Sequence, residues 1–436
     1  MATYDATCFR ATHNSYSGGV RGSIVDQLRS GVRLIELDVH AKGFDTLRDF
    51  RVGHLKPGAE VSLGNGNPDT PMLSDWLATI ARWSNENVHA PITLVLDSKD
   101  DLIGADCGGP EDLNEALEAA FGAQLYARDE RDRDGAWPET GDLGNRVLCV
   151  LSGNGNTRAS YRWTLGTEPA LSVNARGDVV LVYRSTAGDL NCFLGAMTAA
   201  GAVEWQHKST YCFSRMPLSR PVVSVNDEGW IVGAHQFEPP EGFVGSRLES
   251  VLGRITEGRR VMWFGSEVFA QGGAPWLELK GREVRAVHAV TGGYRRVTGA
   301  LDTRRRDVDW GKTRKVQAAP PPSDRVVWQG TAYRCATDAT GAIVCGPEAG
   351  ELRPVRFRQV AFVEEQKGDL RDSLRDALFF AADAKDRPAL EAARQRGRVV
   401  RAWGFEECDV PGCSQIAATD DPRAAWYERF TDAWPA

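Results

Sequence analysis

The sequence lacks several features that would assign it quickly to a class. Its 436 residues contain no apolar run of the length that a transmembrane helix needs. Residues 1–9 lack the charged and apolar regions of a signal peptide. Lysine and arginine number 52 against 59 aspartates and glutamates, and a net charge of −7 argues against a broad nucleic-acid-binding surface. We therefore expect a protein that stays in the cytoplasm or, if a leader has been removed, is secreted or lies at a membrane surface.

Three common catalytic motifs are absent as well. There is no Gly-x-Ser-x-Gly elbow, no P-loop and no His-Glu-x-x-His helix. The nine cysteines are an odd number, so at least one thiol stays outside any intramolecular disulfide. Cys335 with Cys345, and Cys408 with Cys413, are close enough in sequence to bridge, although free buried thiols fit the spacing equally well.

What is present is an alternation of short apolar strands and helical segments at both ends of the chain. We predict strands at 8–12, 33–38, 50–54, 92–97, 147–151, 360–364, 399–403 and 415–418, with a helical region at 369–395. Such alternation predicts an α/β fold, and eight strands predict a TIM-like (β/α)8 barrel. The two parts of this barrel would be residues 1–152 and 357–436.

The middle block, residues 153–356, carries an internal repeat instead. The segment Ser-Val-Asn at Ser172 recurs at Ser224, and similar glycine-containing segments precede Trp205, Trp263 and Trp310. Repeats of this length are typical of propeller-like blades, which are small antiparallel sheets that stack on their neighbours. We therefore predict an all-β repeat domain inserted into the barrel. The sequence names no ligand or protein partner for it.

Oxygen-bearing side chains gather at the carboxyl ends of the predicted strands, where barrels of this kind carry their active sites. Asn14 follows the first strand, Glu36 and Asp38 end the second, and Asp97 ends the fourth. Because Glu36 and Asp38 are two residues apart, their carboxylates share one face of the strand. Such hard oxygen ligands suit Ca²⁺, with Mg²⁺ as the second choice.

Two histidines and a lysine lie at the same strand ends. His13 follows the first strand, His54 ends the third, and Lys99 lies just beyond the fourth. Beside a cation, two imidazoles can form an acid–base pair, in which one takes a proton from a hydroxyl and the other protonates a leaving alkoxide. Lys99 is a candidate contact to a substrate phosphate or headgroup. This set of side chains predicts phosphodiester cleavage.

Structural roles for the same residues are the alternative. A single buried histidine is more often a hydrogen-bonded core residue than a catalyst, and Asp97 could cap a helix. Glu36 and Asp38 could pair with arginines such as Arg33 or Arg51. The joint placement at four successive strand ends favours the functional interpretation.

Several segments of the chain resemble a known family. They are 11–16 (Ala-Thr-His-Asn-Ser-Tyr), 27–38, 52–54, 91–101, 399–405 and 418–422, the last followed by Trp426 and Tyr427. In these segments the sequence resembles the X-region of bacterial calcium-dependent phosphatidylinositol-specific phospholipases C. The resemblance implies a phosphatidylinositol-type phospholipid at a membrane surface as substrate, with diacylglycerol and a (cyclic) inositol phosphate as products.

The resemblance also implies a role for each matched histidine. His13 would be the general base on the inositol 2-hydroxyl, or would stabilise the transition state. His54 would be the general acid for the diacylglycerol leaving group.

The resemblance further implies that Asn14, Glu36, Asp38 and Asp97 hold a calcium ion. Calcium-independent members are expected to place an arginine where the metal lies, whereas this sequence keeps carboxylates. Asp97 departs from the glutamate of many relatives, and its side chain reaches less far.

Two other functions fit the same residues. A glycerophosphodiester phosphodiesterase or phospholipase D-like lipid hydrolase would share the two histidines and the carboxylates, but it would release a free headgroup alcohol. A binding protein would use the β-repeat domain to recognise a glycan, a lipid or a protein, and its barrel would be vestigial. The intact His13 and His54 argue against a vestigial barrel.

Overall fold

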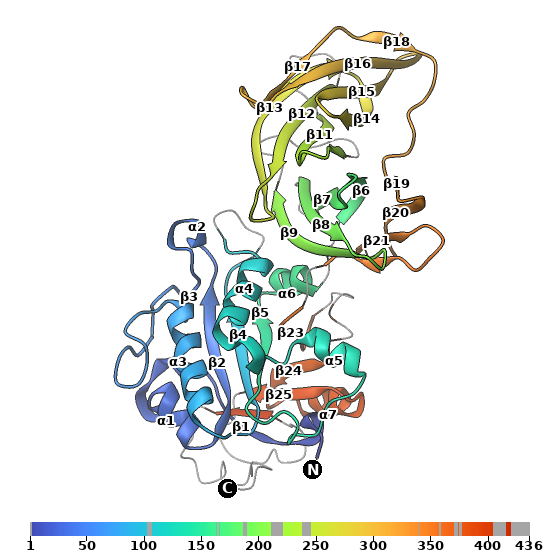
Figure 1. Ribbon diagram of the computed structural model, residues 1–436. Coiled ribbons are helices and arrows are strands. Elements are labelled where there is room, and N and C mark those ends of the chain that lie inside the picture. The colour runs from blue at the N-terminus through green and yellow to red at the C-terminus, as the bar shows by residue number, and fades with distance from the viewer. Residues whose placement is uncertain are drawn as a thin grey trace. The chain divides into compact units, whose positions relative to one another are not determined.

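The chain folds into two compact units (Figure 1). The computed structural model describes residues 2–102, 107–162, 164, 166–185, 190–210, 221–237, 246–339, 341–356, 359–369, 374, 377–403 and 416–419. The first unit comprises Met1–Arg162 and Arg358–Ala436, and the second is Trp163–Phe357. Within the described ranges, no helix has both the length and the apolar character needed to cross a membrane.

The first unit is built around one sheet of nine described strands. They are β1 (Phe9–Thr12), β2 (Val32–His40), β3 (Arg51–Val52), β4 (Ile92–Ser98), β5 (Val147–Gly153), β23 (Phe362–Gln366), β24 (Phe379–Asp383), β25 (Val399–Trp403) and β26 (Ile416–Thr419). Their order is β1-β26-β25-β24-β23-β5-β4-β2-β3, and every neighbouring pair is parallel except β2 with β3. Since β1 also pairs with β2, the two ends of the row of parallel strands meet.

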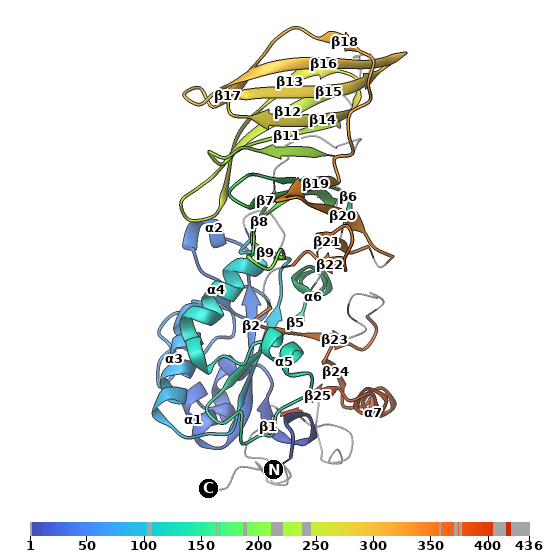
Figure 2. The same ribbon diagram turned by 45° about the vertical axis from the view of Figure 1, so that its right-hand side comes forward.

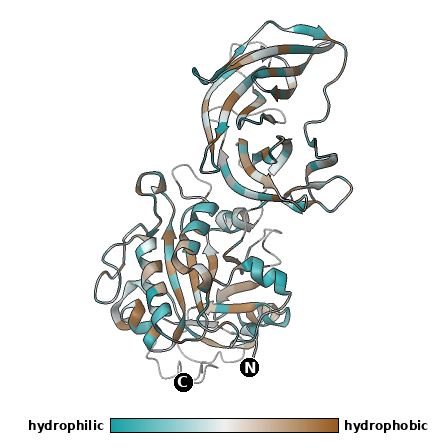
Figure 3. Ribbon diagram, in the orientation of Figure 1, coloured by the Kyte–Doolittle hydropathy of each residue, from teal (hydrophilic) through white to brown (hydrophobic). Residues whose placement is uncertain are grey.

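Helices in this unit are short and unevenly distributed. They are α1 (Ile24–Arg29), α2 (Phe44–Leu47), α3 (Leu73–Glu86), α4 (Pro110–Phe121), α5 (Arg128–Asp134), α6 (Gly155–Arg162) and α7 (Arg387–Gln395), with 3₁₀ turns at Tyr4–Ala6, Ser15–Ser17, Gly19–Arg21 and Gly122–Gln124. The longest, α3, buries Leu73, Trp76, Leu77 and Ile80, the spacing of one helical face. The strands beneath are hydrophobic along most of their length (Figure 3).

The prediction of an α/β (β/α)8 barrel is wrong. Strand accounts for 45% of the structure and helix for 20%, which is a mostly β composition and not that of a (β/α)8 barrel. Part of the predicted helical region 369–395 is strand β24, because Phe379 and its neighbours form a continuous apolar run that is buried in the sheet. The predicted strand 50–54 is only the two-residue β3, which is antiparallel and lies outside the parallel row.

The second unit consists of four antiparallel sheets with a propeller-like arrangement of strands (Figure 2). The first two sheets hold β6 (Gly166–Val173), β7 (Asp178–Ser185), β8 (Leu190–Met197) and β9 (Val203–Thr210), then β10 (Val222–Val225), β11 (Trp230–Phe237), β12 (Arg247–Ile255) and β13 (Val261–Gln271). The third holds β14 (Gly273–Lys280), β15 (Glu283–Val290), β16 (Gly293–Asp302), β17 (Asp307–Trp310) and β18 (Arg314–Val316). The fourth holds β19 (Arg325–Trp328), β20 (Thr331–Thr337), β21 (Ile343–Pro347) and β22 (Arg353–Pro354).

The sequence repeat links one sheet to the next. The Ser172 hydroxyl accepts a hydrogen bond from the backbone of Val225, and the Ser224 hydroxyl accepts one from Leu279, at 3.1 and 2.8 Å. The asparagine of the repeat also bonds to the backbone of the following sheet, since the Asn226 amide donates to the Gly281 carbonyl at 2.7 Å. Each copy of the repeat therefore forms hydrogen bonds with backbone groups of the following sheet, and these bonds link neighbouring sheets.

The two segments of the first unit that flank the second unit in the sequence contact each other. Arg158, on α6, donates to the carbonyl of Glu364 at 2.7 Å and forms a buried ion pair with Asp369. The Tyr161 hydroxyl accepts a hydrogen bond from the backbone of Ala361 at 2.9 Å. The chain thus leaves and re-enters the first unit at neighbouring points.

The cysteine predictions have a partial outcome. Cys335 and Cys345 lie directly opposite each other on β20 and β21, and none of the six cysteines among the described residues is in a disulfide. Cys408, Cys413 and the tail segment from residue 420 onward lie outside the described residues.

Candidate functional site

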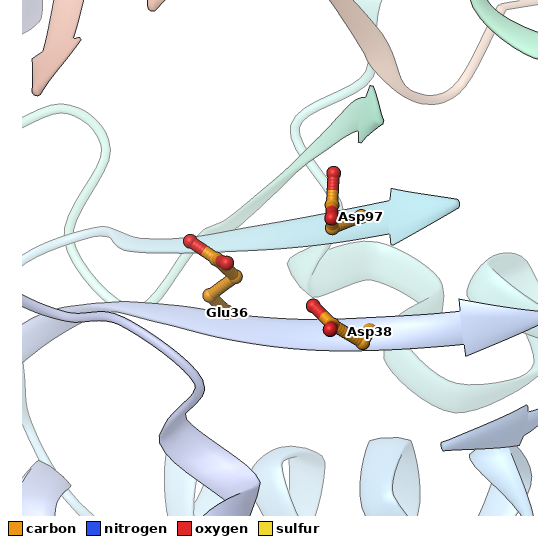
Figure 4. A group of neighbouring side chains, drawn as sticks. All are labelled: Glu36, Asp38 and Asp97. Atoms are coloured by element: carbon orange, nitrogen blue, oxygen red, sulfur yellow. The ribbon is translucent and has the colours of Figure 1, made fainter. Parts of the chain in front are cut away.

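Three carboxylates converge at the carboxyl ends of two neighbouring parallel strands (Figure 4). Glu36 and Asp38 project from the same face of β2, and Asp97 on β4 is in direct register with Asp38. One oxygen from each carboxylate lies within 4.8 Å of the others. Glu36 and Asp38 are buried, whereas Asp97 is partly exposed. The group has the hard oxygen atoms and the spacing that a divalent cation needs.

Asp38 is the carboxylate of this group that lies opposite Asp97 on the neighbouring strand. Its side chain is completely buried, and its Oδ1 atom has no hydrogen-bond partner among the described residues. Burial raises the pKa of Asp38, and repulsion from Asp97 raises it further. A buried acceptor without a donor is costly in a folded protein, and a bound cation would satisfy it.

Lys99 lies against the same carboxylates. Its Nζ atom is 2.8 Å from Asp38 Oδ2 and 2.5 Å from Asp97 Oδ2, so a single ammonium bridges the two acids. Burial lowers the pKa of Lys99, but the Asp97 and Asp38 carboxylates outweigh it and raise the pKa above its ordinary value. The predicted substrate contact is therefore, in this structure, the counter-ion of two predicted metal ligands.

Glu36 is held from the opposite side by Arg401 of β25. The Arg401 Nη1 atom lies 2.6 Å from Glu36 Oε2, while Nε and Nη2 form a bidentate pair with Glu364 of β23 at 2.8 and 2.9 Å. Arg401 Nη2 also donates to Ser152 of β5 at 3.1 Å. These buried contacts join four strands of the sheet and fix the position of the Glu36 carboxylate.

His13 lies beside the other oxygen of Glu36. Its Nε2 atom is 3.6 Å from Glu36 Oε1, and its side chain is about one-third exposed. Burial raises the pKa of Glu36 to about 7, although Arg401 and His13 both lower it. A glutamate with this pKa can share or exchange a proton with a neighbouring imidazole near neutral pH.

Asn14 adopts the left-handed backbone conformation, at φ 50°, two residues after the end of β1. Its Oδ1 atom accepts a hydrogen bond from the buried Tyr16 hydroxyl at 3.2 Å. The 3₁₀ turn that follows brings Ser15 back to β2, where its hydroxyl accepts from the Glu36 backbone at 2.8 Å. The first strand end is thereby tied to the second.

His54 follows β3 and has a different neighbour. Its Nδ1 atom lies 3.2 Å from Glu60 Oε2, and its side chain is 36% exposed. The adjacent Gly53 donates its backbone N–H to the carbonyl of Asp38 at 3.1 Å, which anchors this loop at the end of β2. The described ion pair of the His54 imidazole is thus with its own loop and not with the carboxylates.

The structure therefore brings together Glu36, Asp38, Asp97, Lys99 and His13. Asn14 and His54 lie on loops that start at the same strand ends. The predicted roles of these residues stay predictions.

Two buried residues of the site were not found from the sequence, namely Arg401 and Glu364. Arg401 interrupts one apolar segment that was predicted to be a buried strand, and Glu364 ends another. A charged residue in such a strand requires a buried partner, and this was the available signal.

Comparisons with known proteins give partial similarity only. No family model matches the chain. No curated protein matches it. Among solved structures, a calcium-dependent phosphoinositol-specific phospholipase C from Pseudomonas sp is 25% identical with a TM-score of 0.31, over 34% of this chain and 57% of that one. A Ca²⁺-dependent phosphatidylinositol-specific phospholipase C from Streptomyces antibioticus is also 25% identical with a TM-score of 0.31, and the match covers 36% of this chain and 56% of that one.

A third solved structure, the phosphatidylinositol-specific phospholipase C from Listeria monocytogenes, is 18% identical with a TM-score of 0.27, over 36% of this chain and 54% of that one. The chain spans less than two thirds of the length of these structures.

Proposed function

We propose that the chain is a calcium-dependent phosphodiesterase that cleaves phosphatidylinositol-type phospholipids at a membrane surface into diacylglycerol and a (cyclic) inositol phosphate. The observation that carries the proposal is the convergence of Glu36, Asp38 and Asp97 within 4.8 Å, beside His13. The sequence segments around these residues, which resemble those of bacterial phospholipases C, support the choice of substrate.

The residues fit a calcium ion. Glu36, Asp38 and Asp97 offer only oxygen atoms, and the buried Asp38 Oδ1 has no donor among the residues that the structure describes. Asn14 would complete the set from the neighbouring strand end. Ca²⁺ is favoured over Mg²⁺ because it accepts several carboxylates in irregular geometry. When bound, the cation would neutralise negative charge that develops on the phosphate.

His13 would act as the general base. Its Nε2 atom faces Glu36, and Arg401 holds that carboxylate in place from the far side. A fixed carboxylate beside an imidazole orients the ring and stabilises its protonated form. The proton taken from the attacking inositol hydroxyl would therefore rest on His13.

His54 would act as the general acid. Its Nδ1 atom pairs with Glu60, which would leave Nε2 to carry the proton that the leaving alkoxide needs. Partial exposure of the ring would give it access to substrate.

Phosphorus NMR of the products tests the proposal. Phosphatidylinositol and phosphatidylcholine are incubated with the protein in calcium and in excess chelator, and His13→Ala is run in parallel. We expect a cyclic inositol phosphate signal that requires calcium and disappears in the variant, while the variant keeps the wild-type melting temperature. A free headgroup alcohol would instead indicate a phospholipase D-like or glycerophosphodiester hydrolase. No turnover of either lipid would overturn the proposal and favour a binding protein.

A further inference from the structure

His40 is a buried histidine of the first unit that has no part in the proposed reaction. It is the last residue of β2, two residues beyond Asp38 and on the same face of the strand. Its side chain is only 6% exposed. Because buried polar groups in native proteins have hydrogen-bond partners, the partners of this ring show which parts of the chain it holds together.

The first partner of His40 is the carbonyl of Gly53, the residue that precedes His54. The ring Nε2 atom lies 3.0 Å from this oxygen, and because a carbonyl only accepts, Nε2 is the donor. The backbone N–H of the same Gly53 donates to the Asp38 carbonyl at 3.1 Å. Gly53 is therefore bonded to β2 through both of its polar backbone groups, and one of these bonds depends on the His40 side chain.

The turn that follows Gly53 is closely packed against it. A Cβ atom on Gly53 would lie 2.4 Å from the Lys56 carbonyl oxygen and 2.6 Å from the Gly58 nitrogen, so only glycine leaves room for the turn. The backbone N–H of His54 donates to the Ala59 carbonyl at 3.1 Å and closes the turn. The His54 side chain thus projects from a tight turn whose first residue is held by His40.

The other side of the His40 ring faces the loop that follows β4. Its Nδ1 atom lies 3.5 Å from Asp100 Oδ2. The neighbouring residue Lys99 donates its backbone N–H to the Val39 carbonyl at 2.9 Å, which holds the same loop against the end of β2. His40 therefore lies between the loop of the predicted general acid and the loop that follows the carboxylate of β4.

We propose that His40 is a positioning residue for His54: through the Gly53 carbonyl it fixes where the predicted general acid lies relative to the three carboxylates. The inference rests on the proposed function, in which His54 protonates the leaving alkoxide. A hydrogen bond that only satisfied a buried carbonyl would stabilise the fold, and its loss would affect every substrate equally. A positioning role instead predicts a loss of activity that depends on how much the leaving group needs a proton.

Two substrates that differ in their leaving group test this inference. Dispersed short-chain phosphatidylinositol releases an alkoxide that requires a proton, whereas a nitrophenyl ester of inositol phosphate releases a nitrophenolate that does not. With calcium present, His40→Leu should lower kcat on the lipid about 100-fold with KM within about threefold, because a small misplacement of a catalytic group has an effect of this size. Its kcat on the nitrophenyl ester should stay within about threefold of wild type.

Two polar variants separate the two contacts of the ring and decide the question even if His40→Leu does not fold. In His40→Gln the side-chain amide can take the place of Nε2 and donate to the Gly53 carbonyl, whereas the shorter amide in His40→Asn reaches only the place of Nδ1. We expect His40→Gln to stay within about tenfold of wild type on the lipid, and His40→Asn to behave like His40→Leu. The same ratio of lipid to ester turnover in both amide variants would overturn the inference.

The matched control is His89→Leu. His89 is also completely buried in the first unit, and its ring nitrogens bond to the Ser84 hydroxyl and the Ala90 carbonyl, both at 2.7 Å, ahead of the amino end of β4. This variant should lower the melting temperature and leave the ratio of the two activities unchanged. An equal loss of both activities in His40→Leu would show that His40 has a structural role alone.

The wild-type protein and His54→Ala separate this inference from the proposed function. His54→Ala should show the same dependence on the leaving group as His40→Leu, with a larger loss on the lipid. If it does, and the His40 variants do not, only this inference is contradicted. If the wild-type protein turns over neither substrate, the proposed function is overturned and this inference with it.

Discussion

The two units of the chain differ in whether the oxygens of a buried carboxylate have hydrogen-bond partners. In the second unit, both oxygens of Glu249 are satisfied, by His235 Nε2 at 3.3 Å and by the Ser266 hydroxyl at 2.6 Å. In the first unit, Asp38 is buried with an unsatisfied oxygen and is repelled by Asp97. A buried acid whose oxygens are both satisfied is typical of a structural role, whereas crowded buried acids are typical of the cation site proposed above.

The largest expected effect that sharpens this contrast is on stability. Arg401→Met removes a buried arginine that contacts both Glu36 and Glu364, and it leaves these two buried carboxylates without that partner. We expect a loss of about 3–5 kcal/mol in the free energy of unfolding, measured in urea. The partner experiment in the second unit is Arg259→Met, which breaks the contact with Asp178 at a side chain 37% exposed, and it should cost about 1 kcal/mol. Equal losses would remove the contrast.

The next effect concerns the pH dependence of cation binding. Because burial raises the pKa of Glu36 to about 7, this group is protonated below that pH and must lose its proton to bind calcium. Calcium affinity, measured by calorimetry, should therefore fall about tenfold between about pH 8 and about pH 6. The Glu36→Gln variant should bind weakly with a flatter pH profile. A wild-type affinity that is constant over this range would show that Glu36 is not a ligand.

A comparable effect, in the opposite direction, is expected at Lys99. Its ammonium bridges Asp38 and Asp97, so calcium must displace it. Lys99→Met should raise calcium affinity at least about tenfold, because it removes a charged competitor for two ligands. The exposed Lys42→Met is the matched control and should leave the affinity unchanged. Weaker binding in Lys99→Met would mean that the lysine supports the cation site.

The smallest effect belongs to the repeat of the second unit. Ser224→Ala removes the acceptor for the Leu279 backbone and should cost about 1 kcal/mol in unfolding free energy. Ser172→Ala, which removes the equivalent bond to Val225, should cost the same. The exposed Thr291→Ala should cost nothing measurable. Unequal costs at the two serines would show that the two copies of the repeat are not equivalent.

The sequence predicted the proximity of the carboxylates because it depends on local geometry. Glu36 and Asp38 share a strand face through their two-residue spacing, and Asp97 ends a strand that pairs directly with theirs. The repeat at Ser172 and Ser224 likewise predicted stacked sheets, because it recurs in the chain itself. The functional roles of the three carboxylates do not follow from local geometry and stay predictions.

The features that the sequence did not predict depend mainly on contacts between distant parts of the chain. Arg401 and Glu364 reach Glu36 only after β23 and β25 take their places in the sheet, and a single sequence does not give that order. The helix predicted around Phe379 failed because an apolar run of this length suits a buried strand as well as a helix. The length of strand β3 was overestimated, because a two-residue strand is too short to show a periodicity in the sequence.

The fastening of α6 to the start of β23 has a consequence for the order of folding. Arg158 and Tyr161 can meet Glu364 and Ala361 only when the whole second unit lies between them as a closed loop. If that unit is already folded, its effective loop is about 20-fold shorter, and closure costs about 2–3 kcal/mol less in chain entropy. The second unit is then expected to fold early, during synthesis. Once folded, it would hold α6 and β23 close together, so that the interrupted sheet can form.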